Sequence, residues 1–318
     1  MTGTATDRTV ATCVFGSVAR GDSDGISDKD ILIVSANSAQ RALESAVWRA
    51  RGWSIASYTP RRLVTMSHAG SLFLQHLKSE GLVLNDEDGL LRDILSSYRP
   101  RADYSSDVSD CLEALRLIEG CRSTPLMSYW AADVLFVIFR NASILHLAND
   151  RIYKFSFAEI AQTLRERGNI CSDDLQTLAA LRKAKAAFRS RTFQPTDAWP
   201  TVDGVLRIME RVFGKSVSRI SAFHSSPASL DDPYFSLRGI EKLLLEQGLT
   251  EDSPHRSDAV RQVWKMIVDP RAYSWDIKVH HRALADDIHN MLKGRNQAKL
   301  LIPGTGATMD EAKQLILP

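Results

Sequence analysis

The sequence predicts an α+β protein in which a small mixed-sheet domain is followed by an all-α helical bundle region. Short β-branched apolar runs, separated by turns rich in Gly, Ser and Asp, are confined to the first 60 residues. Beyond residue 104, apolar residues recur at helical spacing instead. With 318 residues, 44% of them hydrophobic, the chain is long enough for two or three packed units.

The first part of the chain is expected to contain three strands and three helices. Its apolar runs are bounded by turn residues, Gly52 follows a helical pattern, and Pro60 suits the first turn of another helix. A hinge and a polar turn are expected at 81–85. The expected strands are 9–15, 30–35 and 53–58, and the expected helices are 37–51, one from Pro60, and 71–79.

The remainder is expected to be helical. Ser156 and Glu159 have the spacing of a capping box, and Ser172-Asp-Asp opens a further helix. The domains predicted are 1–103, 104–215 and 225–318. The expected helices are 108–119, 127–149, 156–168 and 172–188, which form a four-helix bundle, and, after a Ser-rich linker at 216–229, those at 234–247, 257–268 and 275–293.

Composition excludes several classes of protein. Lys and Arg number 40 against 38 Asp and Glu, so the chain is not a polybasic nucleic-acid-coating protein. Its apolar runs fall short of the roughly 18 to 20 residues of a membrane span, and its N-terminus lacks the apolar core of a signal peptide. We therefore expect a soluble, cytoplasmic protein that makes no membrane contact.

Two groups of residues that could bind a phosphate or a metal ion lie between the first two strands. Gly16 and Ser17 lie where a strand ends, so that backbone N–H groups and the Ser hydroxyl can donate to a phosphate. Asp28 and Asp30 are two residues apart at a strand start, which places both carboxylates on one face. Such a pair, together with substrate phosphates, suits Mg²⁺.

The joined pattern of strand, Gly-Ser, polar turn, Ser-Asp-x-Asp and strand resembles the signature of the DNA polymerase β-like nucleotidyltransferase superfamily, in its minimal form. The resemblance covers roughly the first 100 residues. It implies a catalytic domain that moves a nucleoside monophosphate from an NTP or dNTP to a hydroxyl and releases pyrophosphate. The implied residues are Gly16, Ser17, Arg20 and Ser27 for the nucleotide, and Asp28 and Asp30 for catalysis and for Mg²⁺ or Mn²⁺.

The chain departs from that family at one position with chemical consequences. Members usually carry a third carboxylate on the strand after the intervening helix, and the corresponding position here is near Ser54. Three readings stay open: another acid enters the site, the acceptor supplies its own activation, or activity is weak or lost. The acids considered as replacements are Asp86, Glu87 and Asp103.

A second candidate site is the Arg-Asn-x4-His string of Arg140 and His146, which resembles the motif of RNA-cleaving HEPN domains. Six residues do not place two side chains on one side of an ideal helix. Position 148 also lacks the Tyr that toxin members often carry. The alternative is a polar helix end with a buried, hydrogen-bonded histidine.

The sequence leaves several acceptor substrates and protein partners open. The acceptor is a nucleic-acid end, a protein hydroxyl or a small molecule, and the family context implies bacterial antiviral defence or a toxin–antitoxin pair with a cognate effector protein. A HEPN-type RNase and a catalytically weak nucleotide sensor are the alternative functions, and a homo-oligomer is compatible with the sequence. Arg182, Lys185 and Arg189 can share a helix face that either tracks a nucleic acid or is simply solvated.

Overall fold

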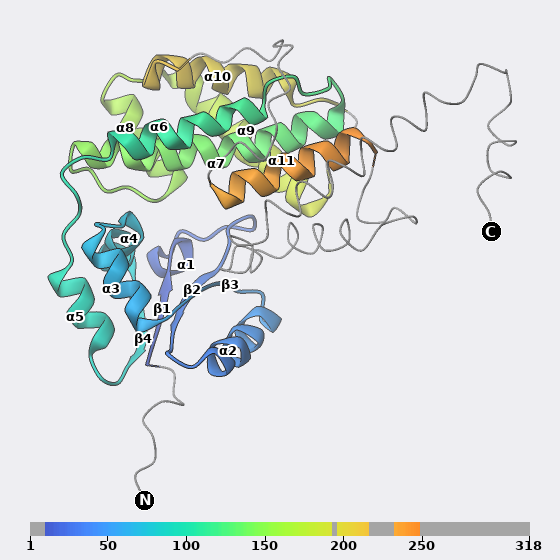
Figure 1. The fold of residues 1–318 in the computed structure, drawn as a ribbon. Coiled ribbons are helices and arrows are strands. Elements are labelled where there is room, and N and C mark those ends of the chain that lie inside the picture. The colour runs from blue at the N-terminus through green and yellow to red at the C-terminus, as the bar shows by residue number, and fades with distance from the viewer. Residues whose placement is uncertain (1–9, 193–195, 216–231, 249–318) are drawn as a thin grey trace, which may run out of the picture. The chain divides into compact units, whose positions relative to one another are not determined.

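The computed structural model describes residues 10–192, 196–215 and 232–248. The chain forms two compact units, Met1–Ser225 and Ser226–Pro318. The first contains a four-stranded mixed sheet with its helices, and then a run of helices (Figure 1). The predicted α+β class, with a small sheet followed by a helical region, is confirmed.

The sheet is built from antiparallel and parallel pairs. Strand β1 runs antiparallel to β2 and to β4, whereas β2 and β3 are parallel and are joined through helix α2 (Ser38–Ala50). The strand order is β3-β2-β1-β4, with β1 at Ala11–Phe15, β2 at Asp30–Val34, β3 at Ser54–Tyr58 and β4 at Leu82–Asp86.

One face of this sheet carries the core of the sheet domain. Side chains alternate along a strand, so every second residue of β1 and β2 points to the same side. There they pack with three helices, α3 (Pro60–His68), α4 (Leu72–Glu80) and α5 (Leu90–Ser97). Buried residues of this core include Cys13, Phe15, Leu32, Val34, Leu63, Leu74, Leu77 and Leu91.

Several predicted details of the elements are wrong. Residues 81–85, expected as a hinge and turn, contribute to edge strand β4, whose apolar residues Leu82, Val83 and Leu84 are exposed and so lack the pattern of a buried strand. Helices α5 and α10 (Trp199–Phe213) were not predicted. Ser156 stands at the N-cap of α8 (Phe157–Glu166), but its side chain makes no capping hydrogen bond.

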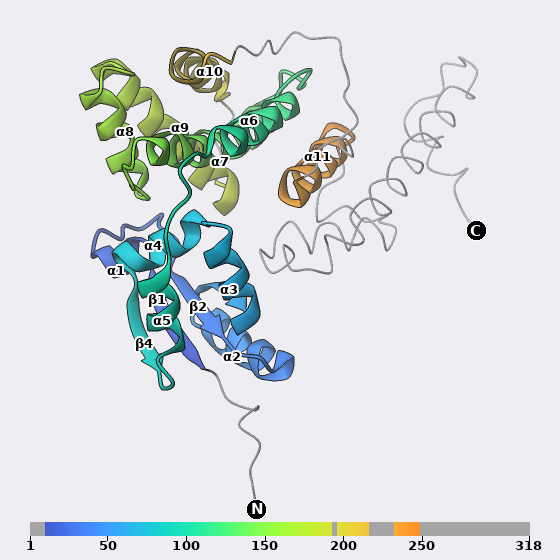
Figure 2. The same ribbon diagram turned by 60° about the vertical axis from the view of Figure 1, so that its left-hand side comes forward.

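Helix α7 (Pro125–Asn149) is the centre of the helical region. It packs against α6 (Ser105–Glu113), α9 (Ser172–Ser190) and α10 (Figure 2). A short 3-10 turn, Ala114–Leu117, connects α6 to the loop before α7. A helix that is apolar around most of its circumference is stable only when neighbours cover it, as they do here.

Helix α7 also corrects the expectation that no segment is long enough to cross a membrane. It spans 25 residues, and by length and composition alone it could do so. However, 67% of its most apolar window is buried inside the structure, which is the pattern of a core helix. This is consistent with a soluble protein.

The link between the sheet domain and the helices is fixed to the sheet domain. The boundary expected near Pro100–Tyr104 falls in this link, between α5 and α6. The hydroxyls of Tyr98 and Tyr104 both donate to the carbonyl of Gly70, at 3.3 and 2.7 Å.

Within the helical region, Arg189 of α9 pairs with the fully buried Asp133 of α7 at 2.8 Å, and this ion pair connects the two helices.

The second unit is described only over 232–248. Helix α11 (Pro233–Glu246) occurs there as predicted, and Asp232 caps it by accepting from the backbone N–H groups of Tyr234 and Phe235. The linker expected at 216–229 and the helices expected at 257–268 and 275–293 lie outside the described residues, as does most of the predicted domain 225–318.

Candidate active site at the end of strand β1

The turn after β1 brings the backbone against an acidic side chain. Gly16 has a φ of 72°, and a Cβ at this position would lie 2.9 Å from Oδ2 of Asp30. Only glycine combines this backbone conformation with so close an approach. The chain then forms a short helix, α1 (Ser17–Arg20), where a polar turn was expected. The hydroxyl of Ser17 donates to the carbonyl of Asp28 at 3.2 Å.

Asp28 and Asp30 lie beside this turn because β1 and β2 pair antiparallel, which places Asp30 opposite Phe15. Both acids line the same cavity. The Asp28 side chain is 72% exposed, whereas Asp30 is partly buried. Burial raises the pKa of Asp30 above its ordinary value, and repulsion by Asp28 raises it further. The two carboxylates therefore act on one another as like charges.

Ser54 occupies the position where the resemblance leads one to expect a third carboxylate. It is the parallel partner of Asp30 in the sheet, and its hydroxyl hydrogen-bonds the Asp30 carboxylate, which lowers the pKa of Asp30 and opposes the effect of burial. The acids considered as replacements, Asp86, Glu87 and Asp103, are not among the residues that line the cavity. Asp86 instead accepts from the backbone N–H groups of Leu91 and Arg92, and Asp103 from that of Ser105.

Arg20 and Ser27 also line the cavity, and both are engaged by side chains around it. Arg20 pairs with Glu80 at 2.5 Å and with Asp22 at 3.1 Å. The carboxylate of Glu80 also lies at hydrogen-bond distance, 2.9 Å, from the Nε2 atom of His76. The hydroxyl of Ser27 lies 2.7 Å from Asp24.

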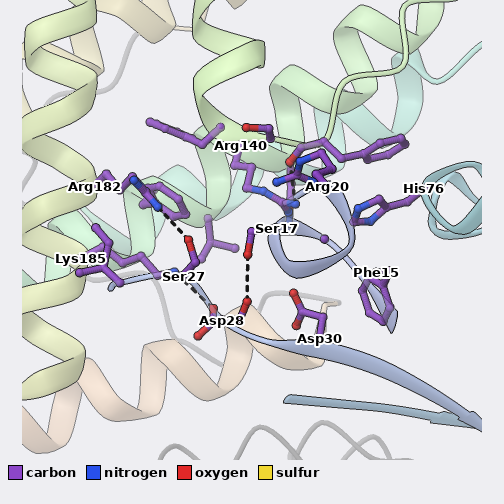
Figure 3. Close-up of a pocket in the computed structure, with 18 of the residues that line it drawn as sticks. Phe15, Ser17, Arg20, Ser27, Asp28, Asp30, His76, Arg140, Arg182 and Lys185 are labelled. Atoms are coloured by element: carbon purple, nitrogen blue, oxygen red, sulfur yellow. Dashed lines mark hydrogen bonds and ion pairs between the residues drawn. The ribbon is translucent and has the colours of Figure 1, made fainter. Parts of the chain in front are cut away.

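The cavity has a volume of about 400 Å³ and is lined by two parts of the first unit. The sheet domain contributes the Gly-Ser turn, the Asp pair and His76. The helical region contributes Arg140 from α7, a segment around Phe155, and Arg182 and Lys185 from α9 (Figure 3). Five phenylalanines add an apolar lining: Phe15, Phe73, Phe136, Phe155 and Phe157.

Arg140 and His146, predicted together as a second site, are not brought together in one cavity. Arg140 lines the cavity just described, whereas His146 is not one of its lining residues. The ring of His146 packs edge-to-face on Phe213 of α10 at 5.6 Å, and burial lowers its pKa. Because α7 continues unbroken through both positions, their six-residue spacing keeps them on different sides of the helix.

The basic face of α9 is engaged rather than freely solvated. Arg182 holds the carboxylate of Asp24 through two hydrogen bonds of 2.7 and 3.0 Å. One turn later, Lys185 lies 3.8 Å from Oδ2 of Asp28 and 4.7 Å from the ring centre of Phe136. Sequence reasoning identified this face but not its partners, because Asp24 and Asp28 lie more than 150 residues away in the chain and Phe136 lies on another helix.

The Asp pair passes a test of chemical fit for a divalent cation. Its donors are hard oxygens, and Mg²⁺ is commonly held by one or two carboxylates that substrate phosphates and waters complete. The mutual repulsion that raises the pKa of Asp30 is the kind of unfavourable term that a bound cation removes. Among the described ranges, no group of three or more His, Cys, Asp or Glu side chains is placed to hold a metal. A cation held by this pair would therefore need further ligands, such as substrate phosphates or waters.

Comparison with known proteins adds no relative: no protein-family model matches the chain, and no curated protein matches it. Any functional conclusion therefore depends on the residues of the cavity.

Proposed function

We propose that this protein is a metal-dependent nucleotidyltransferase of the DNA polymerase β-like type. It transfers a nucleoside monophosphate from an NTP or dNTP to a hydroxyl and releases pyrophosphate. One observation carries the proposal: the Gly16-Ser17 turn and the Asp28-Asp30 pair line one cavity together with four cationic side chains. A triphosphate needs this combination of donors, cations and a metal-holding acid pair.

Each group of residues in the cavity would have its own role in the transfer. Oxygen of the acceptor hydroxyl forms a bond to the α-phosphorus, while the bond from that phosphorus to the bridging oxygen breaks and pyrophosphate leaves. Asp28 and Asp30 would hold Mg²⁺ or Mn²⁺, which when bound neutralises phosphate charge. Ser17 and the N–H groups of the turn after Gly16 would orient the phosphates. Most of the catalysis would then come from positioning and charge neutralisation.

The proton of the acceptor hydroxyl has no third carboxylate to receive it, because Ser54 stands in that place and bonds Asp30, so the proton would leave to water or to the departing pyrophosphate. Among the described residues, Asp28 and Asp30 are the only acids that line the cavity. A general base typically contributes about 10²- to 10⁴-fold in rate. We therefore expect slow but measurable transfer unless the acceptor is itself acidic.

The biological context is a proposal that rests on the resemblance, and the location is one that rests on the composition. They comprise a cytoplasmic role in bacterial antiviral defence or in a toxin–antitoxin pair. The separation of Arg140 from His146 gives no support to the alternative RNase function.

The proposed function is tested by incubating the purified protein with each labelled NTP and dNTP, Mg²⁺ and a panel of nucleic-acid and protein acceptors. Label should be transferred by the wild type and by Asp88→Asn, a control at an exposed acid outside the cavity. Asp28→Asn and Asp30→Asn should each abolish the transfer. Transfer that persists in both variants would exclude this site as the catalytic one.

A further inference from the structure

Arg140 differs from the other cations that line the cavity. Arg20 is paired with Glu80, Arg182 with Asp24, and Lys185 lies within 3.8 Å of Asp28. For Arg140, no carboxylate of the described residues lies within ion-pair distance. Its one hydrogen bond runs from Nη2 to the backbone carbonyl of Phe155, at 3.0 Å.

The remaining donors of Arg140 are available to a ligand in the cavity. A guanidinium carries five N–H donors in a planar fork, and the single bond to Phe155 uses one of them. Figure 3 shows the side chain reaching from α7 toward Arg20 and the Gly-Ser turn, above Asp28 and Asp30. The guanidinium therefore lies across the cavity from the acid pair.

The electrostatic situation favours an anion at this place. Arg140 is partly buried, and burial lowers its pKa, because a guanidinium with few water contacts loses hydration of its charge. Asp30 gives the largest opposing effect, which raises the pKa of Arg140. A cation held by Asp28 and Asp30 would offset that stabilisation and leave Glu80, which is already paired with Arg20, as the remaining acid that acts on the guanidinium. Phe155 and Phe157 line the same cavity, and a charge pair beside such apolar side chains is screened less than one in bulk water.

We propose that Arg140 is the oxyanion-binding residue of the helical wall and that it holds a phosphate group. This inference deepens the proposed function and rests on it for the source of the phosphate, which is either the donor triphosphate or a phosphate of a nucleic-acid acceptor. A planar fork matches a phosphate through two parallel hydrogen bonds, which lysine cannot reproduce. Arg140 thus makes helix α7 part of the substrate site.

The first test is binding of tripolyphosphate, in the presence of EDTA, measured by calorimetry. Arg140→Gln should weaken binding about 10- to 100-fold, the usual effect of losing a charge-assisted bidentate contact. Arg140→Lys should recover only part of the affinity. The matched control is Arg165→Gln, at an exposed arginine of α8 outside the cavity, and should bind like the wild type. Equal affinity in folded Arg140→Gln overturns the inference.

A second measurement needs no variant. Phenylglyoxal modifies accessible arginines, and peptide mass spectrometry of the full-length wild type reports the rate at Arg140. Saturating tripolyphosphate should slow modification of Arg140 and leave that of Arg165 unchanged. An unchanged rate at Arg140 overturns the inference.

Two further arms distinguish the source of the phosphate. With Mg²⁺ present, protection of Arg140 by α,β-methylene-ATP assigns it to the donor, and protection only by a single-stranded oligonucleotide assigns it to the acceptor. Protection by neither overturns the inference. If Arg140 is protected but no labelled product ever forms, the proposed transfer fails and the binding inference stands. If Arg140→Gln transfers label with unchanged KM values for both substrates, the inference about Arg140 is wrong and the proposed function still holds.

Discussion

Gly16 is the residue at which backbone geometry and the proposed chemistry meet. Its positive φ and the 2.9 Å approach to Asp30 give two separate reasons against a side chain. We expect Gly16→Ala to lose about 1 to 3 kcal/mol in free energy of unfolding, from backbone strain and from the displaced carboxylate. Nucleotide binding should fall as well, because the carboxylate that moves is a proposed metal ligand.

Two other glycines of the same loop separate these causes. Gly21 also has a positive φ, 78°, but a Cβ there would meet nothing within 4 Å, so Gly21→Ala should show the strain alone, about 1 kcal/mol. Gly25 has neither constraint, so Gly25→Ala should be neutral. Urea unfolding of the three variants checks the order. An equal effect of Gly16→Ala and Gly21→Ala would contradict the importance of the contact with Asp30.

Asp30 should lower the stability of the metal-free protein at neutral pH. Its pKa in the folded state is raised above the unfolded value of 3.8, so the folded protein holds this proton more tightly. The contribution of Asp30 to stability therefore falls as pH rises from 3.8 through the folded pKa and stays low above it. Asp30→Asn should remove this pH dependence and should equal or exceed the wild type in stability at pH 7 without Mg²⁺.

Mg²⁺ should reverse the effect of the Asp30 carboxylate on stability. Added Mg²⁺ should raise the melting temperature of the wild type and leave that of Asp30→Asn unchanged, since a ligand that binds only the folded state stabilises it. Thermal unfolding at pH 5 and pH 7, with and without Mg²⁺, gives the four values needed. A loss of stability in metal-free Asp30→Asn at pH 7 would show that the carboxylate is structural.

At the scale of residues, the sequence predicted the wall of the cavity that the sheet domain forms. It did not assign the residues of the helical wall to the same cavity. The cluster of Gly16, Ser17, Asp28 and Asp30 was predictable because all four belong to one local strand-turn-strand pattern. Arg140 was singled out for a different site, and His76 carried no signal at all. Their places beside the Gly-Ser turn depend on packing between segments about 60 and 120 residues apart in the chain, which local periodicity does not contain.

At the scale of elements, helix α9 forms part of the cavity wall and contacts the loop between β1 and β2 through the Arg182–Asp24 pair. Hydrogen bonds from Arg182 keep the pKa of Asp24 well below its ordinary value. The pair is partly exposed, so Arg182→Ala should change the free energy of unfolding by no more than about 1 kcal/mol. It should nevertheless speed hydrogen exchange across residues 22–28 and weaken nucleotide binding.

The control for this variant is Lys183→Ala, at an exposed neighbour on α9 outside the cavity. Hydrogen exchange measured by mass spectrometry should find it identical to the wild type. Identical exchange in Arg182→Ala and Lys183→Ala would mean that the ion pair does not order the loop.

Local sequence rules predicted those elements that show a clear apolar pattern or a recognisable cap. Strands β1, β2 and β3 and helices α2, α3 and α7 occur where these signals indicated them. Edge strand β4 was missed because its apolar side chains are exposed and Gly81 precedes it. The basic face of α9 was predicted, but its partners Asp24, Asp28 and Asp133 depend on the tertiary fold.

At the scale of the whole molecule, a nearly neutral chain concentrates charge where it is proposed to act. Residues 101–220 carry 17 Lys and Arg against 14 Asp and Glu, and three of these cations, Arg140, Arg182 and Lys185, line the cavity. The acid pair lies on the opposite wall. A polyanionic substrate can thus be bound locally without a basic surface.

The central claim is that the cavity transfers a nucleoside monophosphate, and the position of a label in the donor tests it directly. The protein is incubated with Mg²⁺ and an NTP labelled at either the α- or the γ-phosphate, and the acceptor is analysed for label. The account predicts incorporation from the α-position only, with none in Asp30→Asn. Incorporation from the γ-position, or α-label that persists in Asp30→Asn, would contradict it.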